Sequence, residues 1–268
     1  MRTPRRLRPA VVPAVLVALA TLTVAVTTPT SSLAGDPAPR LLPNIVPERA
    51  QNLDVDRVGS KRFLRFSTIT ANHGLGPIEL SSRLNDCDHD GDLTNDRTAI
   101  QRVYHDLDGN GFDAGDRIEG DKRVAGCFKW HAIHDHWHFQ DYADYQLRKL
   151  TTGSTVASRT KVGFCMLDTA LDDDVETPLV GTPSVRRYDG DGCRTDDFSG
   201  ISVGWEDLYS SSLADQDINV TKVPDGKYCL RLNIDPNGRL EETSDADNAS
   251  TQALKLVGAS VTPLARAC

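Results

Sequence analysis

Residues 62–70 read Arg-Phe-Leu-Arg-Phe-Ser-Thr-Ile-Thr, a segment in which apolar and polar side chains largely alternate. Successive side chains of a β-strand point to opposite faces, so this period of two predicts a strand with one buried face. Residues 227–234, Lys-Tyr-Cys-Leu-Arg-Leu-Asn-Ile, alternate in the same way and precede Asp235-Pro-Asn-Gly238, a typical turn sequence. Both segments indicate a chain built mainly from β-strands.

Four further short segments extend this pattern, at residues 142–150, 161–167, 201–205 and 253–257. No window of the sequence has the apolar period of a long helix. The segments are separated by turns rich in Gly, Asn, Asp and Pro. Regularly spaced short strands of this kind are typical of two packed sheets. We therefore predict a mainly-β fold, a β-sandwich with long connecting loops.

One region, residues 85–120, is rich in Asp, Asn and Gly, and we predict that it is an insertion between strands. It contains two sequences that match the first half of a calcium-binding loop, with oxygen-bearing side chains at alternate positions before a glycine. The candidate calcium ligands are Asp86, Asp88 and Asp90 in the first sequence and Asp106, Asp108 and Asn110 in the second. Neither has the glutamate expected at the twelfth position, so an acidic, solvated loop is the alternative.

The N-terminus indicates export. Residues 1–8 contain four arginines and no acid, an apolar run covers residues 9–26, and Ser32-Leu-Ala34 resembles a cleavage signal. This order predicts a signal peptide at 1–34 and a secreted domain at 35–268, with a retained membrane anchor as the alternative. No second segment is apolar enough for stable membrane insertion after cleavage.

Charge and cysteine content fit an exported domain. The chain has a net charge of −8, and removal of the four arginines in the signal peptide leaves about −12, which disfavours nucleic acid as a partner. This charge could attract amines, or it could simply keep an exported protein soluble. All six cysteines lie in the predicted secreted domain, and we expect neighbours along the chain to pair. The predicted disulfides are Cys87–Cys127, Cys165–Cys193 and Cys229–Cys268.

Four of the seven histidines lie in residues 130–138, Trp-His-Ala-Ile-His-Asp-His-Trp-His. In a single strand, His134, His136 and His138 would project from one face, and Trp137 would face a core. Three imidazoles suit copper, zinc, nickel or iron, and with an open position they could hold a zinc-bound water for hydrolysis. His131 has the opposite parity, so we expect it on the other face.

The pattern Trp-His-x-x-His-x-His-x-His, followed by an acidic and aromatic stretch, resembles the copper-binding segment of the lysyl oxidase family. Residues 161–169, Lys-Val-Gly-Phe-Cys-Met-Leu-Asp-Thr, are similar to that family's Lys-x-x-Phe-Cys-x-x-Asp-Thr motif. Weaker similarities extend the resemblance over most of residues 41–257, at 42–47, 61–66, 72–76, 205–207, 223–228 and 241–248.

The resemblance implies a secreted copper amine oxidase, an oxidoreductase that acts on CH–NH2 donors with oxygen as acceptor. Such an enzyme converts a primary amine, lysine side chains included, to an aldehyde, and releases ammonia and hydrogen peroxide. It implies copper at His134, His136 and His138. It also implies a quinone cofactor made from a tyrosine and a lysine, here Lys161. Asp141 falls where the family has an acid and is the candidate base.

The cofactor tyrosine is the point of departure from the family. Alignment on Cys193 and Trp205 places Asp197 at the tyrosine position, and an aspartate cannot become a quinone. Tyr188 and Tyr209 are the nearest tyrosines in sequence. Two alternatives therefore stand beside the amine oxidase: a secreted copper-binding protein of the same fold without quinone or turnover, and a zinc-dependent hydrolase.

Overall fold

The structure, a computed structural model, describes residues 37–83, 87, 96–173, 186–195 and 198–268, with the backbone alone at 160–162. The predicted signal peptide and the candidate calcium ligands Asp86, Asp88 and Asp90 lie outside the described residues. All elements belong to one compact unit, residues 38–268. The described part of the chain contains no helix that is both long and apolar enough to cross a bilayer.

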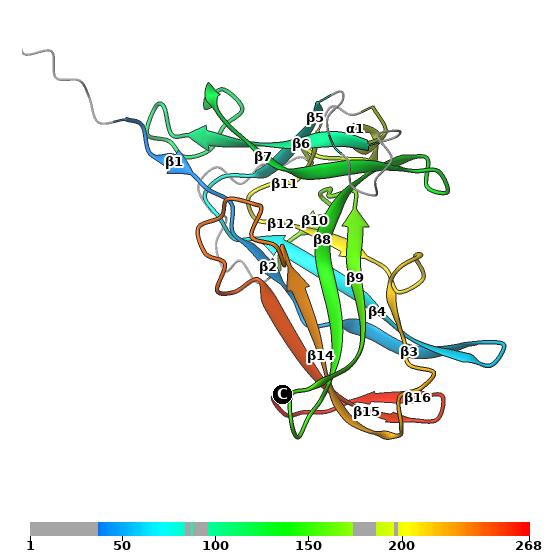
Figure 1. The fold of residues 1–268 in the computed structure, drawn as a ribbon. Helices are drawn as coiled ribbons and strands as arrows, with labels where there is room; N and C mark the ends of the chain where they lie inside the picture. The colour runs from blue at the N-terminus through cyan, green and yellow to red at the C-terminus, as the bar shows by residue number, and fades with distance from the viewer. Residues whose placement is uncertain (1–36, 84–86, 88–95, 174–185, 196–197) are drawn as a thin grey trace, which may run out of the picture. The chain divides into compact units, whose positions relative to one another are not determined.

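The larger sheet has ten antiparallel strands (Figure 1). Its path is β11-β5-β6-β7-β8-β14-β15-β16, with β1 beside β6 and β9 beside β8. The strands are β1 (Arg40–Leu41), β5 (Ile78–Arg83), β6 (Asp96–His105), β7 (Arg117–His131), β8 (His136–Lys149), β9 (Thr155–Phe164), β11 (Ser199–Ile201), β14 (Gly226–Ile234), β15 (Ala249–Val257) and β16 (Ser260–Pro263).

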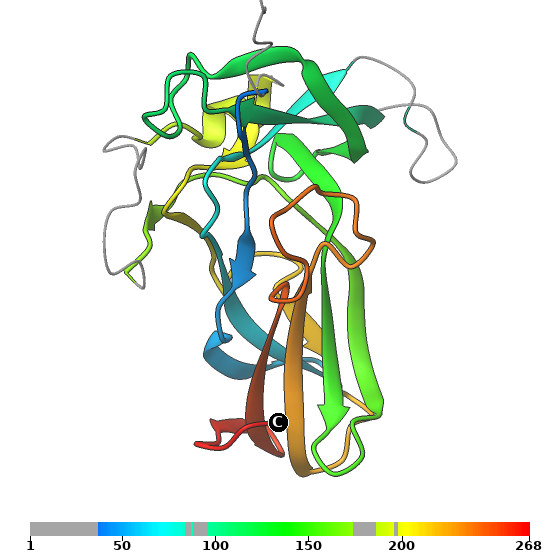
Figure 2. The same ribbon diagram turned by 90° about the vertical axis from the view of Figure 1, so that its left-hand side faces the viewer.

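The second sheet has six strands around β4, which pairs with β2, β3, β12 and β13, while β10 pairs with β12. The strands are β2 (Ile45–Pro47), β3 (Gln51–Val58), β4 (Lys61–Asn72), β10 (Ala170–Leu171), β12 (Trp205–Tyr209) and β13 (Asp217–Asn219). One short helix, α1 (Gly190–Thr195), lies near β11 and the start of β8 (Figure 2). The prediction of a mainly-β fold is confirmed.

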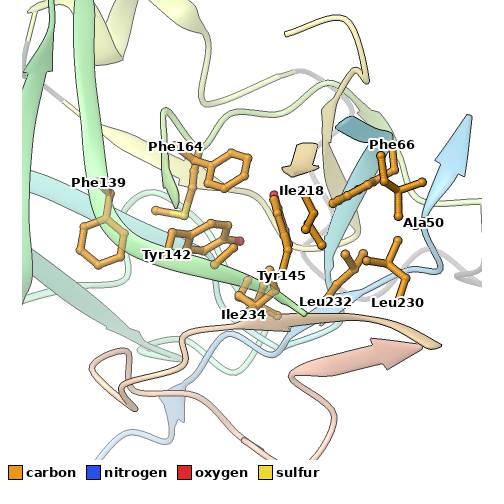
Figure 3. Close-up of a cluster of buried hydrophobic side chains, with 14 of the residues drawn as sticks. Ala50, Phe66, Phe139, Tyr142, Tyr145, Phe164, Ile218, Leu230, Leu232 and Ile234 are labelled. Carbon is orange, nitrogen blue, oxygen red and sulfur yellow. The ribbon is translucent and has the colours of Figure 1, made fainter. Parts of the chain in front are cut away.

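Side chains from both sheets form the main core (Figure 3). Phe66 of β4 meets Tyr145 of β8 edge to face, with ring centroids 5.0 Å apart. Tyr142 packs in the same way on Phe164 at 5.3 Å. Full burial of one such side chain stabilises the fold by about 1.5–3 kcal/mol. The Phe66–Tyr145 contact therefore helps to hold the two sheets together, and the Tyr142–Phe164 contact joins two neighbouring strands of the larger sheet. β8 contributes side chains to the core along most of its length, so the histidines at its start belong to a rigidly packed strand.

Most predicted strands are confirmed, with shifts at their ends. Residues 62–70 lie in β4, 227–234 in β14 and 253–257 in β15. The segment 201–205 is instead a break between β11 and β12, because Gly204 has a φ of 70° and the Trp205 N–H donates to the Ser202 carbonyl at 3.1 Å. Such a turn interrupts the ladder of a strand.

The Asp-rich segment 85–120 is not an insertion throughout. Residues 96–105 form β6, which lies between β5 and β7 inside the larger sheet. Ala99, Val103 and Tyr104 are almost fully buried, and their apolar surface explains why this part folds as a strand. The loop between β6 and β7 contains the second acidic sequence, with Asp106, Asp108 and Asn110.

The three disulfides join Cys87 to Cys127, Cys165 to Cys193 and Cys229 to Cys268, so the predicted pairing is confirmed. The second connects the end of β9 to α1. The third holds the C-terminal residue on β14 (Figure 1).

Candidate active site

The four histidines of residues 131–138 lie on one β-hairpin. β7 ends at His131 and β8 begins at His136. The N–H groups of His134 and Asp135 close the turn by donating to the His131 carbonyl at 3.0 and 2.9 Å. Asp135 has a φ of 57°, a conformation that aspartate adopts more readily than most residues. The single strand expected over 134–138 is therefore a turn followed by a strand.

His131 belongs to this cluster, and the expectation that it points away is wrong. It pairs directly with His136, and directly opposed residues of two strands share a face of the sheet. Its ring centroid lies 4.1 Å from that of His134 and 4.6 Å from that of His138. The odd-even rule fails here because the hairpin reverses the chain between His131 and His136.

His138 is the buried centre of the cluster. Its Nε2 lies 2.9 Å from Nε2 of His136 and 3.4 Å from Nδ1 of His134. Burial, reinforced by the neighbouring rings, lowers the pKa of His138 to about 3, and burial also lowers the pKa values of His131 and His136. These imidazoles are therefore neutral at pH 7. Neutral nitrogens that converge on one point are a donor set that fits copper or zinc.

The other face of β8 anchors the hairpin, as predicted. Trp137 and Phe139 are buried. Trp137 packs on Trp130 and Phe139 packs on Phe128, with centroids 5.4 and 5.8 Å apart. Packing on one face thus fixes the positions of the histidines on the other.

A β-bulge follows the histidines. β8 pairs with β9 at Phe139–Phe164 and next at Ala143–Val162, so β8 has two extra residues between these pairs. Asp141 lies in the bulge with a φ of 59°, and its Oδ2 is 3.4 Å from Nη1 of Arg239. Asp141 is not among the described residues that line the cavity beside His134 and His136.

Lys161 lies in β9, two residues before Gly163. A Cβ atom at Gly163 would be 3.2 Å from the Cβ of His138 and 2.6 Å from Nε2 of Gln140. The missing side chain therefore lets β9 approach β8 closely beside the histidines. The backbone of β9 therefore passes close to His138 just after Lys161.

A cavity of about 320 Å³ adjoins the hairpin. His134 and His136 line it together with Tyr209, which is the last residue of β12. The Tyr209 ring packs edge-on against Phe164 with centroids 4.0 Å apart. Its hydroxyl bonds to the backbone of Cys165, and burial raises its pKa well above the usual value. The structure thus places a tyrosine beside the histidines.

The other residues considered for the tyrosine position lie elsewhere. The Tyr188 hydroxyl is buried and donates to Oε2 of Glu79 at 2.9 Å, and Tyr188 is not among the described lining residues. Asp197 lies outside the described residues. Alternation along Trp205, Asp207 and Tyr209 was the available sequence signal, because residues two apart in a strand share a face.

The loop between β6 and β7 uses its acidic groups in several ways. Asp106 accepts backbone hydrogen bonds from Gly109 and Gly111, and Asn110 donates to Asp108. Carboxylate oxygens of Asp108, Asp113 and Asp116 lie within 4.8 Å of one another. The calcium site at Asp106, Asp108 and Asn110 stays a prediction.

Comparison with known proteins agrees with the motifs. A family model described as lysyl oxidase matches residues 121–265. Lysyl oxidase homolog 3B of Danio rerio is 35% identical over 121 residues, which are 45% of this chain and 13% of the relative. Lysyl oxidase homolog 3 of Homo sapiens is 32% identical over 120 residues, 45% of this chain and 14% of the relative.

Protein-lysine 6-oxidase of Sus scrofa is 28% identical over 137 residues, 51% of this chain and 50% of the relative. The chain thus spans half or less of the length of these curated relatives. The matched region contains the histidine hairpin, β9 and every residue described as lining the cavity. This chain belongs to the lysyl oxidase family.

Proposed function

We propose that this chain is a secreted, copper-dependent amine oxidase acting on primary amines, among them the ε-amines of lysine. The reaction is R-CH2-NH2 + O2 + H2O → R-CHO + NH3 + H2O2. Membership of the lysyl oxidase family supports this proposal, and one relative is named for oxidation of protein lysine. The three disulfides are typical of an exported protein.

Copper binds to His134, His136 and His138 in this proposal. The convergence of their ring nitrogens, and the lowered pKa values of His136 and His138, support this role. His131 stacks on His138, and one nitrogen each of His131, His134 and His138 lie within 4.8 Å of one another, so His131 would support these ligands from close by. Residues that support metal ligands in this way strengthen metal binding without contacting the ion.

Lys161 and Tyr209 supply the cofactor. The observation that carries this proposal is the position of Tyr209, which lines one cavity with His134 and His136 and contacts Phe164 and Cys165, three and four residues after Lys161. A quinone formed from these residues would accept the electrons of the amine, and copper held by the histidines would support quinone formation and electron transfer to oxygen. With Tyr209 in this role, the cofactor does not require a tyrosine at position 197.

The surrounding residues orient and shield these groups. Phe164 and the Cys165 backbone fix the plane and the hydroxyl of Tyr209. Leu167, Leu208 and Leu213 line the cavity and would contact the aliphatic part of an amine. Buried imidazoles remain neutral and so keep their lone pairs for metal.

The test uses protein secreted in the presence of copper, denatured and stained for quinone by redox cycling. We expect a signal that disappears in Lys161→Ala and in Tyr209→Phe, together with amine-dependent peroxide from the unmodified protein. Full copper occupancy without stain would instead support the copper-binding alternative. Hydrolysis of a model ester that depends on zinc would support the hydrolase.

A further inference from the structure

Asp207 lies in the cavity wall, at the centre of β12. Trp205, Asp207 and Tyr209 alternate with Glu206 and Leu208 along this strand, and Asp207 is only 2% exposed. It pairs with Thr70 of β4 and lines the cavity together with His134, His136 and Tyr209. A carboxylate is thus buried beside the proposed copper and cofactor residues.

Neither carboxylate oxygen of Asp207 meets a side-chain donor among the described residues, and only the Leu167 backbone approaches the carboxyl group. Burial raises its pKa well above the usual value, and the neighbouring Asp168 and Glu206 raise it further, while the Leu167 backbone only partly offsets the rise. A buried carboxylate without a partner costs free energy and is rare in native proteins. This cost requires an explanation.

Asp168 provides the contrast within the same protein. It is also fully buried, but its two oxygens accept four hydrogen bonds, from the N–H groups of Arg187, Tyr188 and Ser202 and from the Ser202 hydroxyl. Asp168 is therefore satisfied by the fold. Among the described residues, which leave out the side chains of 160–162, Asp207 has no comparable set of donors, and its carboxyl group is available to a ligand.

The cavity selects the chemistry of that partner. The described lining residues include no lysine or arginine, and Asp207 is the one carboxylate among them. Three leucines, Leu167, Leu208 and Leu213, line the same space. A cationic head group next to an alkyl chain matches this combination of one buried carboxyl group and apolar walls, because an ammonium group beside the carboxyl favours its ionised form.

We propose that Asp207 binds the ammonium group of the amine substrate and so positions it beside Tyr209. This inference rests on the proposed function for the identity of the substrate, and the binding role it gives to Asp207 is separate from the base role expected of Asp141. Asp141 is 3.4 Å from Arg239 and is not among the lining residues. Asp207 is thereby a substrate-binding residue that determines specificity for cationic alkyl ligands.

The test measures binding without turnover. Copper-loaded, full-length secreted protein carrying Lys161→Ala is titrated by calorimetry with n-hexylamine and, separately, with 1-hexanol, a neutral compound of similar shape. We expect the amine to bind at least about tenfold more tightly than the alcohol, since hydrogen bonds between charged groups are stronger than those of a neutral hydroxyl. Adding Asp207→Asn should remove this preference and leave alcohol binding unchanged.

Glu206→Gln is the matched control. Glu206 is the neighbouring carboxylate of β12, but it groups with Glu48 and Asp172 and is not among the described lining residues. The amine preference should survive in this variant. Unchanged alcohol binding by Asp207→Asn would show that the cavity itself is intact, which a purely structural role of Asp207 does not predict.

Two outcomes would overturn the inference: no amine preference in the Lys161→Ala protein, or a preference that persists in Asp207→Asn. A persistent preference accompanied by a shift of the copper absorption band would assign amine binding to the metal instead. Because the titrated protein contains no quinone, the result is independent of the cofactor stain. Amine oxidation can thus fail while Asp207 binding holds, and the reverse.

Discussion

The hydroxyl of Tyr209 forms two hydrogen bonds with the backbone of Cys165, accepting from its N–H at 2.7 Å and donating to its carbonyl at 2.8 Å. Cys165 follows the segment that begins with Lys161 and is joined by a disulfide to Cys193 of α1. One side chain therefore connects β12, the end of β9 and α1 at the cavity. This arrangement fixes the tyrosine relative to the lysine motif.

Tyr209→Phe should abolish the quinone stain while leaving copper occupancy unchanged. The phenylalanine ring keeps the packing on Phe164, but the lost hydrogen bonds leave buried backbone groups unpaired, which costs roughly 1–3 kcal/mol. Urea unfolding measures the stability and redox-cycling stain measures the quinone. Tyr188→Phe is the control: it also loses a buried hydrogen bond, to Glu79, but should keep the stain. A quinone stain in Tyr209→Phe as strong as that in Tyr188→Phe would exclude Tyr209 as the precursor.

His138→Ala should lower copper affinity by more than roughly 100-fold, because His138 lies at the centre of the cluster and residues that only support ligands already contribute 10–100-fold. His131→Asn should lower affinity within that smaller range and leave the number of nitrogens coupled to copper unchanged in the electron paramagnetic resonance spectrum. A spectrum with one nitrogen fewer in His131→Asn would identify His131 as a ligand instead.

The Cys165–Cys193 disulfide should affect both stability and the site. Replacing both cysteines with serine removes a cross-link over a sequence separation of 28 residues, which should cost about 3–4 kcal/mol. Because Cys165 and Gly190 line the cavity, quinone formation should also fall.

The Cys229–Cys268 pair is the control for that experiment. Cys229 pairs with Arg148, so it lies about 30 Å along β8 from His138. Its double serine variant should lose stability but keep the quinone stain in the folded fraction. A comparable loss of stain in both variants would show that general destabilisation, and not the local cavity, limits cofactor formation.

Asp207→Asn should raise the melting temperature of ligand-free protein at pH 8. Burial raises the folded-state pKa of Asp207, so as pH rises above about 4 the unfolded state loses its proton first and the parent protein loses stability. Below that pH the carboxyl is protonated in both states, and the variant should gain little. The gain at pH 8 should be at least about 1 kcal/mol.

Asp168→Asn should do the opposite and lower the melting temperature, because an amide NH2 group would meet backbone donors that now bind a carboxylate. Scanning calorimetry of both variants between pH 4 and pH 8 checks the two signs. A pH-independent gain in Asp207→Asn would contradict a buried, unpaired carboxyl.

Local sequence determined the β class and the histidine cluster, whereas the disulfide pairing was one of several that the cysteine order permits and was decided by the fold. Alternation in residues 62–70 and 227–234 reports burial on one face, which a strand encodes within a few residues. The Asp235-Pro-Asn-Gly238 turn could be predicted for the same reason, because its hydrogen bond, from the Gly238 N–H to the Asp235 carbonyl, lies within four consecutive residues. The Trp137 and Phe139 core contacts also follow from parity within one strand.

Tertiary structure decided what lies opposite these residues. The reversal at His134–Asp135 brought His131 into the cluster, although strand parity alone placed it on the other face. The pairing of β12 with β4 accompanies the placement of Tyr209 and Asp207 in a cavity that they share with His134 and His136, which lie more than 60 positions earlier in the chain. Periodicity specifies which face of a strand is buried, but non-local pairing and packing specify which side chains meet there. The histidines could therefore be found from sequence, whereas the tyrosine and the unpaired carboxylate beside them required the fold.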